Sequence, residues 1–490
     1  MEKPDGMFDR DREWAALTRF AADAQAGATL GVVSGRRRQG KSFLLEGLCE
    51  AARGFYFCAS EGTEAEALAF LGAALGAFTG SAAPLRLDGW AEAIDALLGL
   101  GRDRPMPVVL DEFPYLAHAS PSLPSLIQSA YGPRRTGRVS SRTRLLLCGS
   151  AMSFMGRILS GDAPLRGRAG LDMVVRPLDH QLAAAFWGLE ADPSLALQVH
   201  AVLGGTPAYR REFVRNDVPA DRDDFDAWVT RTVLDPASPL FREARYLLAT
   251  EAEISDTALY HSVLAAVAAG NNTRGGIAGY IGRKATDISH PLALLEDIGL
   301  LSREVDAFRS NRSSYRIAEP LIAFYQAVMR PVWPELEHSR DIPQVWARVR
   351  KRFASNVLGP HFEQLCREWT WHMAPRGWLG GVPGRVAAGT VADPAARTSH
   401  QVDVAAFGLS DDGGETLLAI GEAKWHDTMG LGHLSRLRHV RSLLTAQGRP
   451  GAAAARLACY SGSGFTDELR EVAAASGDVV LVDLAQLYRD

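Results

Sequence analysis

The chain has 490 residues, of which 47% are hydrophobic and 22% are charged, as in folded globular proteins, and its length predicts about three domains. Its formal net charge of −4 argues against a protein that coats nucleic acid over its whole surface. This charge does not exclude a basic patch on one face. The sequence has five scattered cysteines, no long apolar run and a polar N-terminus. We therefore expect free thiols and a cytoplasmic protein that does not enter a membrane.

Residues 1–235 alternate short apolar segments with helical patterns. The apolar segments, each of which predicts a strand, lie near residues 30–34, 54–58, 107–111, 144–148 and 173–176. Because parallel strands need crossover helices, this alternation predicts an α/β fold with a parallel sheet covered by helices on both faces. A helical lid is expected to end the domain, and the acidic segment 217–224 is expected to form an exposed loop.

Residues 35–42 form a complete phosphate-binding loop between the first predicted strand and a helix. The motif is made by Gly35, Arg36, Arg37, Arg38, Gln39, Gly40, Lys41 and Ser42. The two glycines permit a tight backbone, and the start of the helix directs backbone N–H groups at one point. Lys41 is expected to reach the β- and γ-phosphates, and the Ser42 hydroxyl to bind Mg²⁺. The sequence therefore predicts ATP and Mg²⁺ as cofactors.

Two later strand ends supply the other polar groups that nucleotide hydrolysis requires. Asp111 and Glu112 follow the apolar segment Val108–Leu110. Asp111 is expected to bind the magnesium ion with Ser42, and Glu112 to polarise the attacking water. Ser150 follows the next strand along the chain and is predicted to sense the γ-phosphate.

Residues 236–335 predict three helices followed by a hairpin. The helices are expected near 258–267, 273–281 and 286–298, and the strands at 301–305 and 314–317. This order is the layout of a winged helix-turn-helix. Arg283, Lys284 and the arginines of the hairpin favour a contact with DNA, whereas the acidic residues of the third helix favour a protein–protein or lid role. The sequence leaves both readings open.

Residues 346–490 predict a third domain that carries a second group of charged residues. A helix from Trp346 to Met373 contains Glu363, and strands are expected at 401–407, 416–424 and 456–460, with a hairpin signal at Asp411–Gly414. Glu422 and Lys424 are two positions apart on one strand and therefore share a face. With Asp403 from the neighbouring strand, two carboxylates and one ammonium group would converge.

Such a group suits a metal-dependent attack on a phosphodiester bond. Asp403 and Glu422 are predicted to bind a divalent ion, Lys424 to position water, and Glu363 to support them from the preceding helix. The alternative is a solvated strand edge, which fits poorly because Ile420, Gly421 and Ala423 predict a mostly buried strand.

With these motifs, nearly the whole chain resembles the archaeal-type ATPase family of STAND/AAA-like P-loop NTPases. Members commonly carry a winged helix and a C-terminal domain similar to PD-(D/E)XK nucleases. The segments that match are Phe8–Glu13, the phosphate-binding loop, Asp111-Glu112, Pro164–Arg168, Gly204–Tyr209, Val402–Val404, Gly421–Trp425 and Gly464-Phe465. The resemblance implies the strand order 5-1-4-3-2, a position near the adenine for Arg10, and a γ-phosphate contact for Arg168.

Two positions depart from the family pattern. Arg166 replaces a tyrosine, which leaves open whether Arg166 or Arg168 meets the nucleotide. His400 stands where the family usually has a glutamate or another polar residue, and the loss of an acid there would weaken a second metal site.

The sequence supports two hypotheses from different classes. The first is an ATP-driven switch that controls a nuclease-like domain acting on DNA or RNA. The second is a nucleotide-regulated nucleic-acid-binding or scaffold protein whose nuclease fold is inactive. A small-molecule kinase would leave the C-terminal half without a role. Both hypotheses are compatible with a homo-oligomer.

Overall fold

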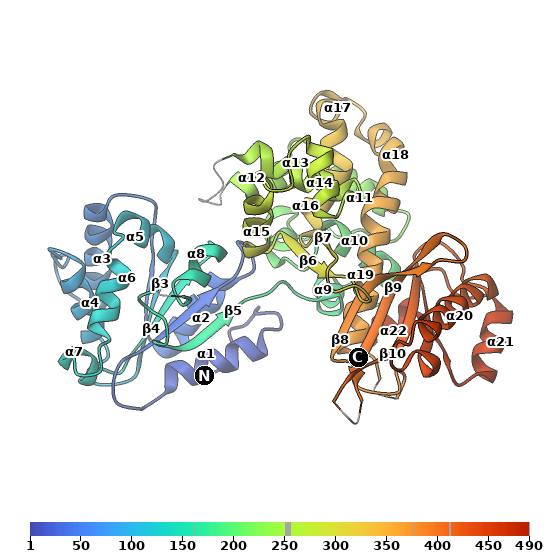
Figure 1. Cartoon of the computed structure of the whole chain (residues 1–490). Coiled ribbons are helices and arrows are strands. Elements are labelled where there is room, and N and C mark those ends of the chain that lie inside the picture. Colours follow the sequence, from blue (N-terminus) through green and yellow to red (C-terminus); the bar gives the residue numbers. More distant parts are fainter. Residues whose placement is uncertain (162, 250–255, 376, 411–412, 490) are drawn as a thin grey trace. The chain divides into compact units, whose positions relative to one another are not determined.

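The computed structural model describes residues 1–161, 163–249, 256–375, 377–410 and 413–489 (Figure 1). The chain divides into two compact units. The first comprises Met1–Pro177 with Thr206–Ala208, and the second comprises Leu178–Gly205 with Tyr209–Asp490. The predicted domain limit at 235 lies inside the second unit, as do the predicted domains 236–335 and 346–490, whose boundaries stay predictions. No helix of the described residues is long and apolar enough to cross a membrane.

The first unit is built on a five-stranded parallel sheet. Its strands, in the order β2-β3-β4-β1-β5, are β1 (Thr29–Ser34), β2 (Phe55–Cys58), β3 (Met106–Asp111), β4 (Thr143–Gly149) and β5 (Ala169–Val174). All five predicted strands are present, and the strand order is the one that the family resemblance implies. The fifth strand begins about four residues earlier than expected.

Helices cover both faces of this sheet, as the sequence predicts. They are α1 (Asp11–Ala22), α2 (Lys41–Ala52), α3 (Glu64–Thr79), α4 (Trp90–Gly99), α5 (Phe113–Ala119), α6 (Leu123–Ala130), α7 (Thr136–Val139) and α8 (Met152–Arg157). On β4, Leu146 and Cys148 pack with α1 and α2, whereas Leu145 and Leu147 pack with α3 to α6. This alternation of side chains gives the unit two apolar layers, one on each face.

A buried arginine ties the start of the sheet together. The side chain of Arg144 on β4 is fully buried and donates hydrogen bonds to the carbonyl oxygens of Asp23, Gln25 and Gly27, at 2.5 to 3.0 Å. These carbonyls belong to the turn between α1 and β1. The guanidinium group therefore gives three backbone oxygens of this turn a hydrogen-bond donor and ties the turn to β4.

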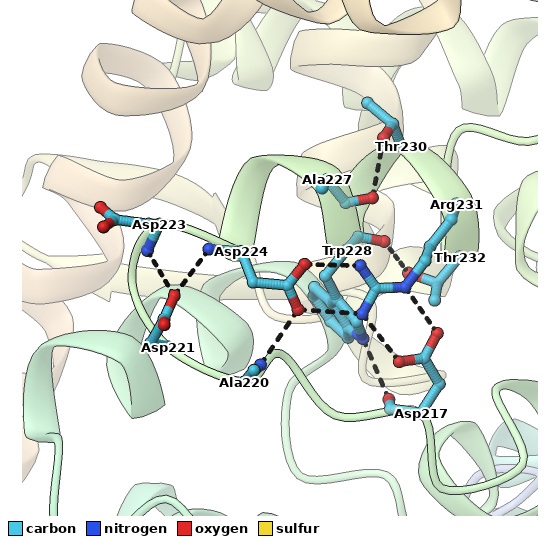
Figure 2. Close-up of polar contacts among 10 residues, drawn as sticks. All are labelled: Asp217, Ala220, Asp221, Asp223, Asp224, Ala227, Trp228, Thr230, Arg231 and Thr232. Carbon is cyan, nitrogen blue, oxygen red and sulfur yellow. Dashed lines mark hydrogen bonds and ion pairs between the residues drawn. The ribbon is translucent and has the colours of Figure 1, made fainter.

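The second unit begins with helices α9 (His180–Trp187), α10 (Pro193–Leu203), α11 (Phe225–Thr232) and α12 (Pro239–Ala249), with a π-helical turn at Tyr209–Phe213. The predicted acidic loop runs into α11 and is exposed over much of its length. Figure 2 shows that Arg231 on α11 reaches back to this loop and pairs with both Asp217 and Asp224 at 2.8 to 3.0 Å. The acidic loop is therefore held to its own helix by one arginine.

Three helices and a hairpin follow, close to their predicted positions. They are α13 (Thr257–Ala268), α14 (Arg274–Ile281), α15 (Ser289–Asp297), β6 (Leu301–Val305) and β7 (Ser313–Ile317). The side chain of Thr273 caps α14, as expected. The turn of the hairpin contacts the C-terminal sheet: the Ala307 N–H donates to the Ala388 carbonyl at 2.8 Å, and Phe308 packs edge-on to Phe407.

Helical segments then lead to the C-terminal sheet. They are α16 (Pro320–Phe324), α17 (Trp333–His338), α18 (Ile342–Phe353) and α19 (Gly359–His372), and a π-helical turn at Ala354–Leu358 makes α18 continuous with α19. One long helix over 346–373 was expected, and its charged residue Glu363 lies on α19.

The C-terminal sheet has five strands of mixed direction, in the order β12-β11-β10-β9-β8. They are β8 (Arg385–Asp393), β9 (Thr398–Leu409), β10 (Glu415–Lys424), β11 (Arg456–Ser461) and β12 (Val479–Asp483), with helices α20 (Leu431–Ala446), α21 (Asp467–Ala475) and α22 (Leu484–Leu487). Strands β8 to β10 are antiparallel, and β10 to β12 are parallel. The predicted hairpin joins β9 to β10, although Asp411 and Asp412 lie outside the described residues.

Helices α19 and α20 pack on opposite faces of this sheet (Figure 1). On β11, Tyr460 donates or accepts a hydrogen bond with Thr370 of α19, whereas its neighbour Cys459 packs in the apolar cluster of α20. Strands β8 and β12 were not predicted. The charged residues of β9 and β10 thus lie in a layered α/β domain between two helices.

Candidate nucleotide site and candidate metal-dependent site

The phosphate-binding loop turns between β1 and α2 on two glycines. Gly35 and Gly40 have φ values of +153° and +86°. A Cβ atom at position 35 would lie only 2.5 Å from the carbonyl oxygen of Val175, so the close approach of β5 excludes any larger residue there. Helix α2 begins at Lys41, and its first N–H groups therefore face the loop.

Lys41 is held across this loop. Its side chain is buried, and its Nζ donates to the carbonyl oxygen of Arg36 at 2.9 Å. Burial lowers the pKa of Lys41, against the opposing charges of Glu112 and Asp111. An ammonium group that has lost water in this way interacts strongly with any anion that enters the loop.

Asp111 is the meeting point of three donors at the end of β3. Its carboxylate accepts hydrogen bonds from Ser42 Oγ and from Tyr56 Oη, each at 2.7 Å, and from the Glu112 N–H at 2.8 Å. Burial alone would raise the pKa of Asp111, but these bonds and one from Cys148 outweigh it and lower the pKa. An ionised carboxylate beside the loop serine is the donor set that Mg²⁺ prefers, so the residues present fit that ion.

Glu112 lies beside the other predicted polar group. Its backbone has φ +51°, an uncommon conformation for a glutamate, and its carboxylate accepts a hydrogen bond from Ser150 Oγ at 3.2 Å. The Arg37 side chain donates to Ser150 at 3.3 Å and to the Tyr115 hydroxyl at 2.9 Å. The loop, β3 and β4 therefore meet through one chain of hydrogen bonds. Strained backbone of this kind is frequent where a side chain must be aimed at a reacting group.

The arginines implied by the family resemblance have different surroundings. Arg10 is buried and donates to the carbonyl oxygen of Gln39 in the loop at 3.2 Å, and to Glu13 at 3.0 Å. Arg166 and Arg168 are both exposed. Arg166 donates to the Gly161 carbonyl at 2.8 Å, and neither contacts residues 35–42 in the described part of the chain. The structure thus brings Arg10 to the loop and leaves the role of Arg168 a prediction.

In the second unit, Asp403 lies where β9 and β10 separate. The last antiparallel pair is Gly421 with Val404, so Asp403 and Glu422 are the next residues of the two strands. The carboxylate of Asp403 accepts the N–H of Ala423 at 3.0 Å and the amide of Gln401 at 3.0 Å. Burial raises the pKa of Asp403, and the charge of Glu422 adds to this effect, whereas the Ala423 hydrogen bond opposes it.

Glu422 is 3% exposed and carries the strongest ion pairs of this group. Its Oε1 pairs with Lys424 Nζ at 3.1 Å and with Arg436 of α20. Its Oε2 is buried and has no hydrogen-bond partner among the described residues. An unsatisfied buried carboxylate oxygen is costly unless a cation or water completes it. The donor set therefore fits a divalent ion, which would take this free oxygen.

Glu363 approaches the same place from α19. Burial, and then the charge of Asp403, raise the pKa of Glu363 to about 7, while Arg367 and Lys424 oppose the shift. The structure thus brings Glu363, Asp403, Glu422 and Lys424 into one charged cluster. Their predicted metal-binding and catalytic roles stay predictions.

Several residues of the two clusters were not predicted. They are Tyr56, Tyr115, Arg367, Gln401 and Arg436. Tyr56 could have been found, because it lies near the end of a strand that neighbours β3. Arg436 carries no signal in the sequence, because it reaches Glu422 only through the packing of α20.

Comparisons with known proteins bear on the fold. A Walker-type ATPase of Pyrococcus abyssi is similar in structure, with a TM-score of 0.51 and 20% sequence identity, over 66% of this chain and 97% of that chain. The five-stranded parallel sheet of the first unit has the fold of a P-loop ATPase. The ORC2 protein of Aeropyrum pernix, in its complexes with ADPNP and ADP, gives a TM-score of 0.38 at 17% identity, over 71% of this chain and 97% of that chain.

The sequence comparisons cover a smaller part of the chain. No family model matches the chain. An uncharacterized protein of Methanocaldococcus jannaschii is 27% identical over 270 residues, which are 54% of this chain and 56% of that relative. The chain therefore matches a little over half the length of that relative.

Proposed function

We propose that the first unit binds ATP with Mg²⁺ and hydrolyses it. The observation that carries this proposal is the hydrogen bond of Ser42 to Asp111 beside a phosphate-binding loop whose lysine is buried. Lys41 and the N–H groups at the start of α2 would hold the phosphates. Ser42 and Asp111 would hold Mg²⁺, which when bound neutralises phosphate charge. Glu112, aimed by Ser150, would orient the attacking water.

Two substitutions test this proposal. Lys41→Ala should abolish hydrolysis and weaken ATP binding, because the loop loses its buried cation. Glu112→Gln should keep binding and reduce turnover at least about 100-fold, because it removes the carboxylate that orients water but keeps its shape. Release of phosphate and binding of a fluorescent ATP analogue are measured together, with the exposed Glu50→Gln as control. Wild-type turnover by Glu112→Gln would contradict the role of Glu112.

We infer that the helices and hairpin of residues 257–317 are a winged helix used for contacts within the protein. The turn residues Ala307 and Phe308 are packed against β8 and β9. The segment of the third helix is acidic, with Asp287, Glu296 and Asp297. Both observations favour a structural role over contact with DNA, because a phosphate backbone would be repelled by these carboxylates.

For the C-terminal domain we propose a metal-dependent nuclease-like function on DNA or RNA, controlled by the nucleotide state of the first unit. The supporting observation is that the buried carboxylates of Asp403 and Glu422 cluster with Lys424 and Glu363, and that one oxygen of Glu422 has no partner among the described residues. Asp403 and Glu422 would hold a divalent ion, which supplies charge stabilisation at the scissile phosphate. Lys424 would position water. Glu363 would share a proton with Asp403 near neutral pH.

The second candidate is a nucleotide-regulated binding or scaffold protein with an inactive nuclease fold. The ion pair of Arg436 with Glu422 favours it, because the arginine takes the oxygen that Lys424 also contacts. A site already neutralised by two cations binds a third only if one of them leaves.

Cleavage assays separate the two candidates. Plasmid DNA, single-stranded DNA and RNA are incubated with Mg²⁺ or Mn²⁺, with and without ATP. If the domain is active, Asp403→Asn should lower metal-dependent cleavage at least about 100-fold, and the exposed Asp427→Asn should leave it unchanged. Cleavage that is equal in the wild type and in Asp403→Asn would come from elsewhere. Binding of nucleic acid without cleavage would favour the scaffold.

A further inference from the structure

A second cluster of metal-ligating side chains lies in the C-terminal domain, formed by residues that the proposed function does not use. It consists of Asp393 at the end of β8, His400 on β9 and His439 on α20. The Asp393 Oδ2 lies 2.8 Å from His439 Nε2 and 3.4 Å from His400 Nε2. The two imidazole rings are 5.2 Å apart and nearly perpendicular, at 83°.

We propose that Asp393, His400 and His439 bind a Zn²⁺ ion. Each residue offers one ligand atom, and the three ligand atoms lie within 4.8 Å of one another. Ligands of a tetrahedral zinc ion, about 2.0 to 2.1 Å from the metal, are about 3.3 Å apart, so small rotations of the three side chains complete the site. Imidazole nitrogens favour Zn²⁺ and neighbouring transition metals over Mg²⁺ and Ca²⁺.

The surroundings of the cluster fit an ion with one exchangeable position. The side chain of Asp393 is 5% exposed, that of His400 is 20% exposed and that of His439 is 50% exposed. The cluster is thus closed on the sheet side and open to solvent at His439. Three protein ligands with an open fourth position are typical of zinc sites that bind water.

Groups around the cluster orient its carboxylate. The second oxygen of Asp393, Oδ1, accepts the N–H of Ala396 at 3.0 Å, which leaves Oδ2 directed at the two histidines. The Gln447 side chain, just after α20, donates to the carbonyl of Ala392 at 3.1 Å and fixes this end of the helix beside β8. Hydrogen bonds that hold a ligand in place are a regular feature of metal sites.

The alternative is that two neutral histidines simply donate hydrogen bonds to Asp393. A single carboxylate oxygen can accept both, so the geometry alone is compatible with it. This alternative does not explain the position of His400. The distance of 3.4 Å from His400 Nε2 to Asp393 Oδ2 is long for a hydrogen bond and normal for two ligands of one metal ion.

The proposed zinc site is linked to the charged cluster of β10, because α20 contributes one side chain to each of them. Arg436, which pairs with Glu422, and His439, which pairs with Asp393, are three residues apart and therefore share a face of α20. An ion held by His439 would anchor that face to β8 and β9.

The test uses the full-length untagged chain, stripped of metal with a chelator and then titrated with Zn²⁺ against a chromophoric competitor. Co²⁺ serves as a second probe, because a tetrahedral site with nitrogen and oxygen ligands gives visible absorption. We expect one Zn²⁺ per chain and an affinity at least about 10-fold lower in His439→Ala, the most exposed ligand. Asp393→Asn should behave in the same way.

Two controls separate this site from others. His338→Gln changes an exposed histidine on α17 and should bind zinc as the wild type does. Asp403→Asn changes the charged cluster of β10 and should also keep zinc binding, whether or not that cluster is a nuclease site. Equal zinc affinity in the wild type and in a folded His439→Ala, or loss of zinc binding in Asp403→Asn, would overturn the proposal. Circular dichroism establishes folding of each variant.

Discussion

Two histidines in contact, His200 buried and His361 half-buried, should make the second unit sensitive to acid. His200 on α10 and His361 on α19 are in direct contact, with His200 Nδ1 2.8 Å from His361 Nε2. One nitrogen must donate and the other accept, so this contact is lost when both rings are protonated. Burial lowers the pKa of His200 from its ordinary value of 6.5 to about 3. Burial, and then the charge of His200, lower the pKa of His361 well below 6.5.

The sign of the effect follows from proton binding. A histidine of the unfolded chain binds a proton below about pH 6.5, whereas each ring of the folded pair stays neutral until far lower pH. The stability from this pair is therefore fully present above pH 6.5 and is lost as the pH falls toward 3. At pH 5.5 the proton that folded His200 excludes costs about 1 kcal/mol, and His361 shifts the stability in the same direction.

The measurement is hydrogen exchange of the backbone amides of α10 and α19 at pH 7.5 and pH 5.5, corrected for the intrinsic exchange rate. The control is His200→Asn with His361→Gln, because these amides place a nitrogen or oxygen where the two imidazole contacts lie and do not titrate. The opening free energy should fall by at least about 1 kcal/mol more in the wild type than in this variant. Other titrating groups, such as His261 and Glu363, are common to both proteins. An equal fall in both would refute the reasoning.

Two more predictions concern arginines of the first unit. Arg144→Met should lower the free energy of unfolding by about 1–3 kcal/mol, because it removes a buried guanidinium group that donates to three backbone carbonyl groups. The exposed Arg102→Met should change it little, and urea unfolding measures both. Arg168→Ala should lower ATP turnover by about 10³-fold or more if Arg168 contacts the γ-phosphate, and Arg166→Ala should not. Near-wild-type turnover in both variants would exclude either arginine from that contact.

The fold of the first unit could be predicted because its signals are local. Each strand is a short apolar run, and the chain turns from strand to helix at Gly35 and Gly40, where only glycine fits easily. The hydrogen bond between Ser42 and Asp111 was also foreseeable, because the carboxyl ends of all strands of a parallel sheet lie at the same edge of that sheet. The chain of contacts through Arg37, Ser150 and Tyr115 was not, because it depends on side-chain conformation.

The C-terminal domain was harder to predict because its contacts are distant in sequence. Strand β8 contains alanine, glycine and threonine in place of large apolar residues, and Gly389 is small because Ala307 and Phe308 pack against it. A Cβ atom at position 389 would lie 2.7 Å from the Phe308 ring. Such a strand has little alternation of its own and is specified by the hairpin that covers it. Asp393, at its end, could not be connected to His439, which lies 46 residues later.

The two charged clusters differ in how their carboxylates are neutralised. Asp111 accepts hydrogen bonds from neutral hydroxyls and an N–H group, so its charge stays available to a cation. Glu422 instead contacts two cationic side chains through one oxygen, while the other oxygen has no partner among the described residues. Arg436 and Lys424 are exposed to a similar extent, but Lys424 lies on the same strand as Glu422, whereas Arg436 reaches it from a separate helix. The position of α20 therefore sets how much negative charge this cluster offers to a divalent ion.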